Sequence, residues 1–290
     1  MSKPPEIPSG DDLEAVPVDK GVEAFFQGTD FILAFSDKVL IPVLRGQLSL
    51  SDREKAIVGT YYRIHLWLRS LICLNAPQHF QAIAVGVRSL YELGIDLELL
   101  AINDKRERLA KFFAFTQVER FRAAKKLVDY CDSHEACSNI ENAELRAFQA
   151  EASVRAIVDA ARKLHWPTLT EKKKYPQHWT GLSISQRAEL AGADYQEIYV
   201  ELFPLLSWYV HSGFAGIAGL SPDAFKAMVA RAHGVAQRIA LRAIRICGCE
   251  MKVPEAYEPF YRVLDMLNIA PGAILAGKQV ELLRCAIEKE

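Results

Sequence analysis

The chain has 290 residues, of which 50% are hydrophobic and 24% are charged, and its formal net charge is −1. This is the composition of an ordinary globular protein rather than of a disordered or fibrous one. A net charge near zero gives no general reason to expect nucleic-acid or membrane binding.

We expect residues 1–18 to be disordered. Over almost all of the remaining chain, apolar residues recur at the spacing of a helix. The predicted helices cover, in order, residues 19–45, 51–75, 77–103, 104–131, 139–165, 194–212 and 222–249, with two short ones after residue 254. Two capping boxes, Ser51 to Glu54 and Ser183 to Gln186, mark helix starts. With no alternating strand pattern, we expect an all-α fold: one compact multi-helix bundle over residues 19–290.

The main interruption lies at residues 166–182, a long loop containing prolines and lysines. Two stretches, Ser70 to Val87 and Leu202 to Pro222, carry no Asp, Glu, Lys or Arg. Both contain prolines and polar residues, so we interpret them as buried core helices and expect no membrane span.

The six cysteines lack the paired spacing of zinc sites. Residues 1–19 are proline-rich and acidic, without the apolar core of an export signal. We therefore expect a cytoplasmic protein with reduced thiols. Cys247 and Cys249 could chelate a soft metal, but we expect no metal centre and no cofactor.

The predicted helix 77–103 is strongly apolar, yet it carries Arg88, Glu92 and Asp96 at four-residue steps. These steps place the three charges in one stripe about 80° wide, while Glu98 points elsewhere. Buried charges are costly unless they are paired and hydrogen-bonded. The pattern therefore predicts a polar cluster inside the core.

Ser207 and His211 are also four residues apart, which places hydroxyl and imidazole on one helix face. An imidazole can move protons near neutral pH, and a guanidinium can stabilise a developing anion. Arg88, Glu92 and His211 would thus suit phosphodiester cleavage that uses the RNA 2′-hydroxyl as nucleophile. The alternative is a satisfied buried network, including Tyr199, that fixes helix register.

Two other groups are candidate binding residues. His178 and Trp179 lie in the long loop near Lys172 to Lys174; the pair would stack on a base or cover a site, or Trp179 would pin the loop to the core. Four arginines, spaced 7, 4 and 3 residues apart, form a stripe about 60° wide: Arg231, Arg238, Arg242 and Arg245.

The stripe could track a phosphate backbone, face solvent, or pair with acids of a neighbouring helix or subunit. A second basic group is Arg120, Arg122, Lys125 and Lys126, flanked by Glu119 and Asp129. The expected ligand-binding residues are Asp96, His178, Trp179, Tyr199, Ser207, Arg231, Arg238, Arg242 and Arg245.

Four features occur in a fixed order over about half of the chain, residues 82–220. They are Arg88-Ser-Leu-Tyr-Glu92, His178-Trp179-Thr-Gly181-Leu-Ser183, Tyr195 with Tyr199, and Ser207-Trp-Tyr-Val-His211. The ordered set resembles a bacterial family of helical proteins catalogued as a domain of unknown function. This resemblance implies an all-helical fold and lends no established activity.

That family is similar, more distantly, to small helical domains of prokaryotic toxins and phage-defence proteins, many of which are metal-independent ribonucleases. Those nucleases carry an arginine followed by a histidine four to six residues later on one helix. No arginine here has a histidine at that spacing. A site of this type would have to combine Arg88 and His211 from two helices.

Two hypotheses follow. The first is an RNA- or nucleotide-directed enzyme of the toxin or defence type, with Arg88, Glu92 and His211 as its chemical set. The second is a non-catalytic helical module that senses a ligand or forms a homo-oligomer, with a structural polar cluster. No P-loop, G-x-G-x-x-G, H-E-x-x-H or G-x-S-x-G motif points to another chemistry.

Overall fold

The structure, a computed structural model, describes residues 18–47, 49–74, 79–102, 106–133, 140–169, 175–210 and 222–253. All regular structure in these residues is helical, which confirms the predicted all-α class. They divide into two compact units: Met1–Ala101 with Ala188–Glu290, and Ile102–Arg187. We describe each unit by itself, and the single domain over residues 19–290 stays a prediction.

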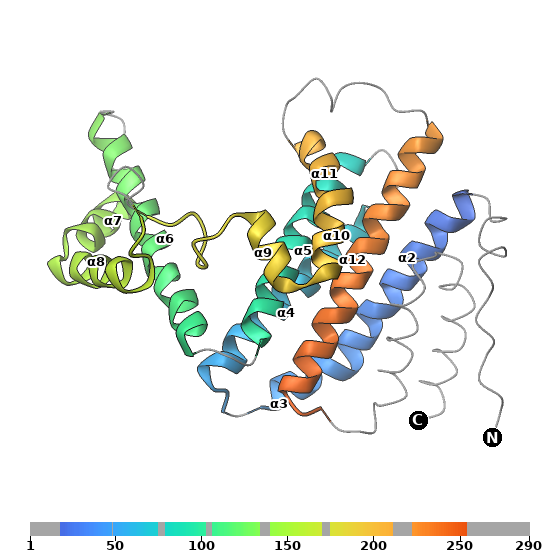
Figure 1. Ribbon diagram of the computed structural model, residues 1–290, viewed down its shortest axis with the longest axis horizontal. Helices are drawn as coiled ribbons and strands as arrows, with labels where there is room; N and C mark the ends of the chain where they lie inside the picture. Colours follow the sequence, from blue (N-terminus) through green and yellow to red (C-terminus); the bar gives the residue numbers. More distant parts are fainter. Residues whose placement is uncertain are drawn as a thin grey trace. The chain divides into compact units, whose positions relative to one another are not determined.

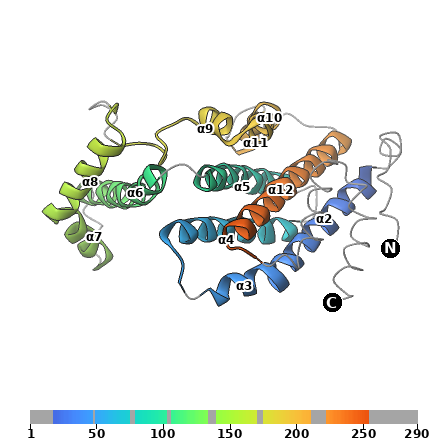
Figure 2. The same cartoon turned by 60° about the horizontal axis from the view of Figure 1, so that its bottom comes forward.

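The first unit is a helical bundle arranged around α5 (Figure 1). Its helices are α2 (Val18–Phe35), the π-helix η1 (Ser36–Leu40), α3 (Ile41–Gly46), α4 (Asp52–Cys73), α5 (Phe80–Ala101), α10 (Ala193–Glu201), α11 (Phe203–Val210) and α12 (Pro222–Glu250). Helices α4, α11 and α12 pack against α5, and α12 also packs against α2 and α4 (Figure 2).

Close packing between α5 and α12 depends on a glycine. A Cβ atom added at Gly94 would lie 2.8 Å from Ile239 Cγ2 and 3.0 Å from the Tyr195 hydroxyl. Real Cβ atoms essentially never come as close as the first of these distances. The missing side chain therefore lets α12 and the start of α10 approach the centre of α5.

The predicted helix 19–45 is observed, but a π-turn interrupts it at η1. Asp37 in η1 accepts bonds from two side chains of α4, His65 Nε2 at 3.1 Å and Arg69 Nη2 at 2.5 Å. Burial lowers the pKa of His65, so its neutral ring donates to the carboxylate. The predicted Ser51–Glu54 capping box is confirmed and begins α4.

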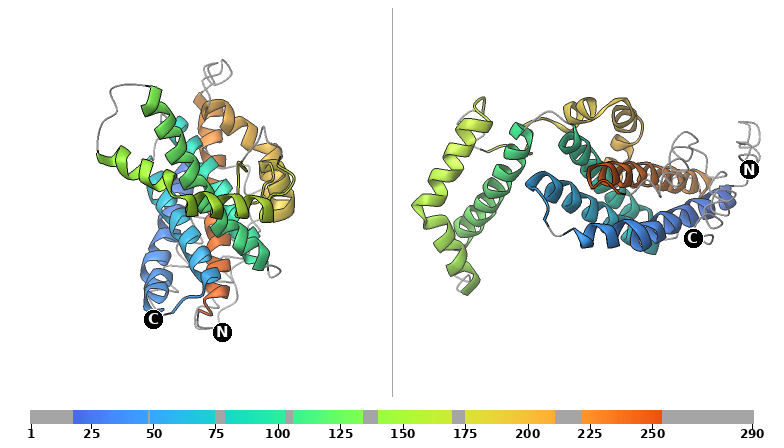
Figure 3. Two further views of the ribbon diagram at one scale, coloured as in Figure 1. Left: turned by 90° about the vertical axis from the view of Figure 1, so that its left-hand side faces the viewer. Right: turned by 90° about the horizontal axis from the view of Figure 1, so that it is seen from below.

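The second unit contains α6 (Arg106–Ser133), α7 (Ile140–Ala150) and α8 (Ala152–His165), with α7 and α8 both packed against α6 (Figure 3). The helix predicted over 139–165 is thus split, because Glu151 leaves the helical conformation and becomes the N-cap of α8.

After α8 the predicted long loop leads to α9 (Ile184–Ala191). The second capping box is confirmed, since Ser183 N donates to Gln186 Oε1 at 3.0 Å and Gln186 N donates to Ser183 Oγ at 3.3 Å.

Some predictions fall outside the described residues. These are the disordered start, up to residue 17, and the short helices after residue 254. The helix predicted over 194–212 is observed as α10 and α11, separated by a turn at Leu202. Among the described helices, none is long and apolar enough to cross a membrane.

Candidate functional site

A pocket of about 200 Å³ lies in the first unit, bordered by α5, α10 and α12. Its lining comprises Glu98, Ala191, Gly192, Ala193, Asp194, Tyr195, Ile198, Arg238, Ile239 and Arg242. Side chains from segments about 100 residues apart in sequence therefore share one cavity, and four of them carry charge.

Glu98 and Arg242 form the strongest polar interaction in the pocket. The glutamate is 6% exposed, and both of its carboxylate oxygens accept from the guanidinium, Oε1 from Nε and Oε2 from Nη2 at 3.2 Å. The hydrogen bond to Glu98 raises the pKa of Arg242. The fork geometry fixes both side chains and places a neutralised ion pair in the lining of the pocket.

Arg238 lies one turn before Arg242 on α12 and is held much more loosely. Its ion pair is a single 3.8 Å contact with Glu197 Oε2, and the glutamate side chain is 55% exposed. Solvent-exposed pairs at this distance contribute little. Arg238 is therefore the cation of the pocket whose charge is most available to a ligand.

Apart from the charged Asp194, the remaining wall is apolar and helical. Tyr195, Ile198 and Ile239 are buried, and burial raises the pKa of Tyr195, with the charge of Glu98 adding to the effect. Its hydroxyl consequently stays protonated. Gly192 precedes α10 with a φ of +124°, and the first turn of α10 borders the pocket. Within that turn Tyr195 and Gln196 both donate their N–H groups to the Gly192 carbonyl, at 3.1 Å.

The predicted buried charge stripe on α5 is corrected by the structure. Arg88 and Glu92 are 25% and 39% exposed at their side chains, and Asp96 is only partly buried. The buried charge is Glu98, which the stripe excluded. Helix α5 is covered on more than one side, but the face that carries Arg88, Glu92 and Asp96 stays partly exposed to water.

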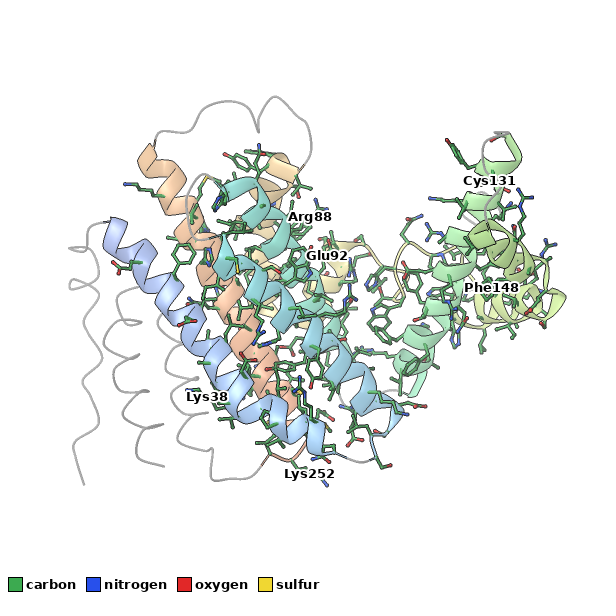
Figure 4. All side chains as sticks on the ribbon, turned by 180° about the vertical axis from the view of Figure 1, so that it is seen from behind. Lys38, Arg88, Glu92, Cys131, Phe148 and Lys252 are labelled. Carbon is green, nitrogen blue, oxygen red and sulfur yellow. The ribbon has the colours of Figure 1, made fainter. Side chains whose placement is uncertain are left out.

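Part of the predicted cluster does come together, around Phe203 of α11. The Arg88 guanidinium lies 4.8 Å above the Phe203 ring, and Arg88 Nε lies 3.7 Å from Glu92 Oε1 one turn along α5 (Figure 4). Tyr199 stacks on the same ring at 5.5 Å. Ser207 instead donates to the Phe203 carbonyl at 2.8 Å, inside its own helix.

His211 lies outside the described residues, so the predicted meeting of Arg88 with His211 stays a prediction. The same holds for Ser207 with His211.

The arginine stripe of α12 pairs with acids of neighbouring helices, one of the alternatives left open by the sequence. Arg231 forms an ion pair with Glu201, Arg238 contacts Glu197, and Arg242 pairs with Glu98. Arg245 is exposed near the end of α12. The pairs join α12 to α10 and α5, and they neutralise much of the charge that a phosphate backbone would need.

His178 and Trp179 lie in the second unit, where Trp179 is 2% exposed and meets Phe112 edge-on at 5.7 Å. The Trp166 indole donates to the Trp179 carbonyl at 2.9 Å. His178 Nε2 lies 2.8 Å from Arg187 Nη1; because arginine only donates, this nitrogen accepts. In this structure Trp179 holds the loop on the helices.

Metal binding finds no support in the described part of the chain. No group of three or more His, Cys, Asp and Glu side chains lies there in a suitable arrangement. Cys247 is buried and Cys249 is exposed, so the two thiols point in different directions.

The sequence profile of a family of unknown function, DUF5677, matches residues 54–223. The chain belongs to this family. The DUF5677 match includes Glu98 and all of α10, whereas Arg238 and Arg242 lie beyond it. In the comparison with curated proteins and in that with solved structures, nothing matches the chain.

Sequence reasoning missed Glu98 and the start of α10 as site residues. A signal for Glu98 was present, because it continues the helical series Val87, Tyr91 and Gly94, all of which are buried. No comparable pattern marks residues 191–195, since their contribution comes from a turn and a helix start.

Proposed function

We propose that the first unit binds a small organic anion in the pocket between α5, α10 and α12, and that it acts as a ligand-sensing module. The observation that carries the proposal is the placement of Arg238 beside a buried wall of Tyr195 and Ile198. A guanidinium and an apolar wall in one cavity suit a ligand with a carboxylate at one end and a hydrocarbon part at the other.

The size of the pocket limits the ligand. Its volume of about 200 Å³ falls below the roughly 300–1,000 Å³ of sites that hold drug-sized molecules. A ligand with a single anionic group is favoured, because Arg242 is already paired with Glu98 and leaves Arg238 as the available cation.

A sensing role follows from the weak contact between Arg238 and Glu197. A bound anion replaces the Glu197 carboxylate at the guanidinium, which releases that link between α12 and α10. Ligand binding then removes the Arg238–Glu197 contact that links α10 to α12. The bound and free states differ in this contact, and a conformational response requires such a difference.

The test is a thermal-shift titration of the full chain with short-chain and aromatic carboxylates, each compared with its neutral amide. We expect the thermal midpoint to rise with carboxylate concentration in the parent and not with the amide. Arg238→Gln should abolish the rise. Arg63→Gln is the matched control, because Arg63 is exposed on α4 and does not border the pocket.

The proposal fails if no carboxylate raises the midpoint, or if Arg238→Gln responds as the parent does.

The RNA-directed enzyme with Arg88, Glu92 and His211 is the second candidate. It is favoured by the partly exposed Arg88 guanidinium and by the Tyr199 ring stacked on Phe203 beside it. Cleavage of a labelled RNA by the parent, lost in Arg88→Ala and His211→Ala at unchanged thermal midpoints, would support this candidate.

A further inference from the structure

A second, larger cavity lies in the second unit, on the surface formed by α6, α7 and α8. It measures about 400 Å³, within the range of sites that hold a ligand of nucleotide size. Its lining comprises Phe121, Lys125, Gln149, Arg155, Val158, Asp159, Arg162 and Tyr175. We call it the α6–α8 groove.

The cationic side of the groove follows from the spacing on α8. Arg155, Asp159 and Arg162 lie four and three residues apart, so all three face the groove from one side of the helix. Arg155 Nε donates to the Gln149 carbonyl at 3.3 Å, a contact that orients the guanidinium without neutralising it. Arg162 is partly exposed.

Lys125 adds little net charge, because its ammonium pairs with both carboxylate oxygens of Asp129, at 3.1 and 3.0 Å. The two arginines of α8 therefore border the cavity together with one carboxylate, that of Asp159 on the same helix. This excess of positive charge suits a single phosphate, which guanidinium groups bind through paired hydrogen bonds.

Two aromatic rings also line the groove. The Phe121 and Tyr175 rings are 6.2 Å apart, with Phe121 buried and Tyr175 partly exposed. Arg122 of α6 donates to the Pro176 carbonyl at 3.0 Å, which fixes the loop beside Tyr175. A partly exposed ring on a fixed loop is a suitable surface for stacking a nucleobase.

The carboxylate of Asp159 distinguishes a nucleotide from a simple polyanion. Inside the groove it repels a second phosphate, but it accepts hydrogen bonds from ribose hydroxyls or from base amino groups. We propose that the α6–α8 groove binds a nucleoside monophosphate unit, with Arg155 and Arg162 on the phosphate, Tyr175 against the base and Asp159 on a sugar or base donor. This inference is independent of the anion pocket in the first unit.

The probe is AMP carrying a fluorescent methylanthraniloyl group on its ribose, measured by anisotropy with the full chain and competed with unlabelled AMP, adenosine and inorganic phosphate. We expect saturable binding in which AMP competes at least about tenfold better than adenosine or phosphate, because each of these supplies only part of the contacts. A fluorescein-labelled single-stranded RNA of ten nucleotides tests whether the groove binds a free nucleoside monophosphate or one that is part of an RNA strand.

Arg162→Glu should weaken binding by about tenfold or more. Lys163→Glu is the matched control: it makes the same charge change in the last turn of the same helix but does not border the groove. If Arg162→Glu lowers the thermal midpoint, Arg162→Gln and Tyr175→Leu replace it.

Tighter binding of RNA than of AMP, with the same loss in Arg162→Glu, would identify a strand as the source of the unit, and the reverse would identify a free nucleotide. Either result supports the site. The proposal is overturned if neither probe binds saturably, or if Lys163→Glu weakens binding as much as Arg162→Glu does.

Discussion

A histidine in the core between α2 and α12 makes the stability of the protein depend on pH. His233 is fully buried, and its ring meets Phe26 of α2 edge-on at 4.4 Å between centroids. Neither ring nitrogen has a hydrogen-bond partner among the described residues. Burial lowers the pKa of His233 from 6.5 to about 4.

The direction of the pH effect follows from this difference. Above the pKa of the unfolded chain the ring is neutral in both states, so His233 causes no pH dependence. As the pH falls from about 6.5 to about 4, His233 becomes protonated in the unfolded chain but stays neutral in the folded protein. Each pH unit is worth ~1.4 kcal/mol, so His233 removes about 3 kcal/mol of folding free energy across this interval.

His233→Leu tests this reasoning, because leucine has a similar volume and carries no polar atom. Near neutral pH the variant should be about 1–2 kcal/mol more stable than the parent, since two unsatisfied nitrogens are removed from the core. The advantage should grow by about 3 kcal/mol as the pH falls to about 4. His65 and His165, whose pKa values burial also lowers, are present in both proteins and cancel in the difference.

The assay is urea unfolding of parent and variant at several pH values, followed by circular dichroism. A difference in the free energy of unfolding that stays constant with pH would refute the reasoning and show that the His233 ring is hydrated or hydrogen-bonded in the folded protein.

Three further predictions concern the core of the first unit. Gly94→Ala should destabilise the protein by about 1–2 kcal/mol, because the added Cβ would collide with α12 and this cost outweighs the gain in helix propensity. Gly59→Ala on α4, where the added Cβ meets open space, should instead stabilise the protein by up to about 1 kcal/mol. Equal effects of the two substitutions in urea unfolding would contradict the close packing described at Gly94. Arg242→Ala should cost about 3 kcal/mol because it leaves the buried Glu98 carboxylate unpaired, and adding Glu98→Gln to it should recover part of that loss; a fully additive double variant would show that the pair is not coupled. Burial raises the pKa of the Cys247 thiol to about 12, so this cysteine should react with Ellman's reagent only when the protein opens. Immediate labelling of the native protein, assigned to Cys247 by mass spectrometry, would disprove the burial of this thiol.

The sequence predicted the helices well because their signals are local. Both capping boxes depend on residues three apart, and the helical periodicity of α4, α5 and α12 is contained within each segment. The break at Glu151 was missed because no proline or glycine marks it. The break at Leu202 was missed although Pro204, in the first turn of α11, is a typical signal for a helix start.

The candidate site was predicted only in part because it depends on which helices meet. The spacing of Arg238 and Arg242 was informative, and the sequence left open whether acids of another helix neutralise them. Their partners, Glu197 and Glu98, become visible only when α10 and α5 are placed beside α12. Burial of Glu98 rather than of the Arg88 stripe likewise depends on tertiary packing, which no pattern within α5 could determine.

The most direct test of the anion pocket is a methyl NMR titration of isoleucine-labelled protein with sodium benzoate, with benzamide as the neutral control. Ile198 and Ile239 line the pocket, whereas Ile64 is buried in α4 away from its lining. We predict that benzoate shifts the Ile198 and Ile239 signals saturably, that benzamide does not, and that Ile64 stays unchanged. Equal shifts with benzamide, shifts confined to other isoleucines, or no shifts in Ile198 and Ile239 would contradict the proposed site.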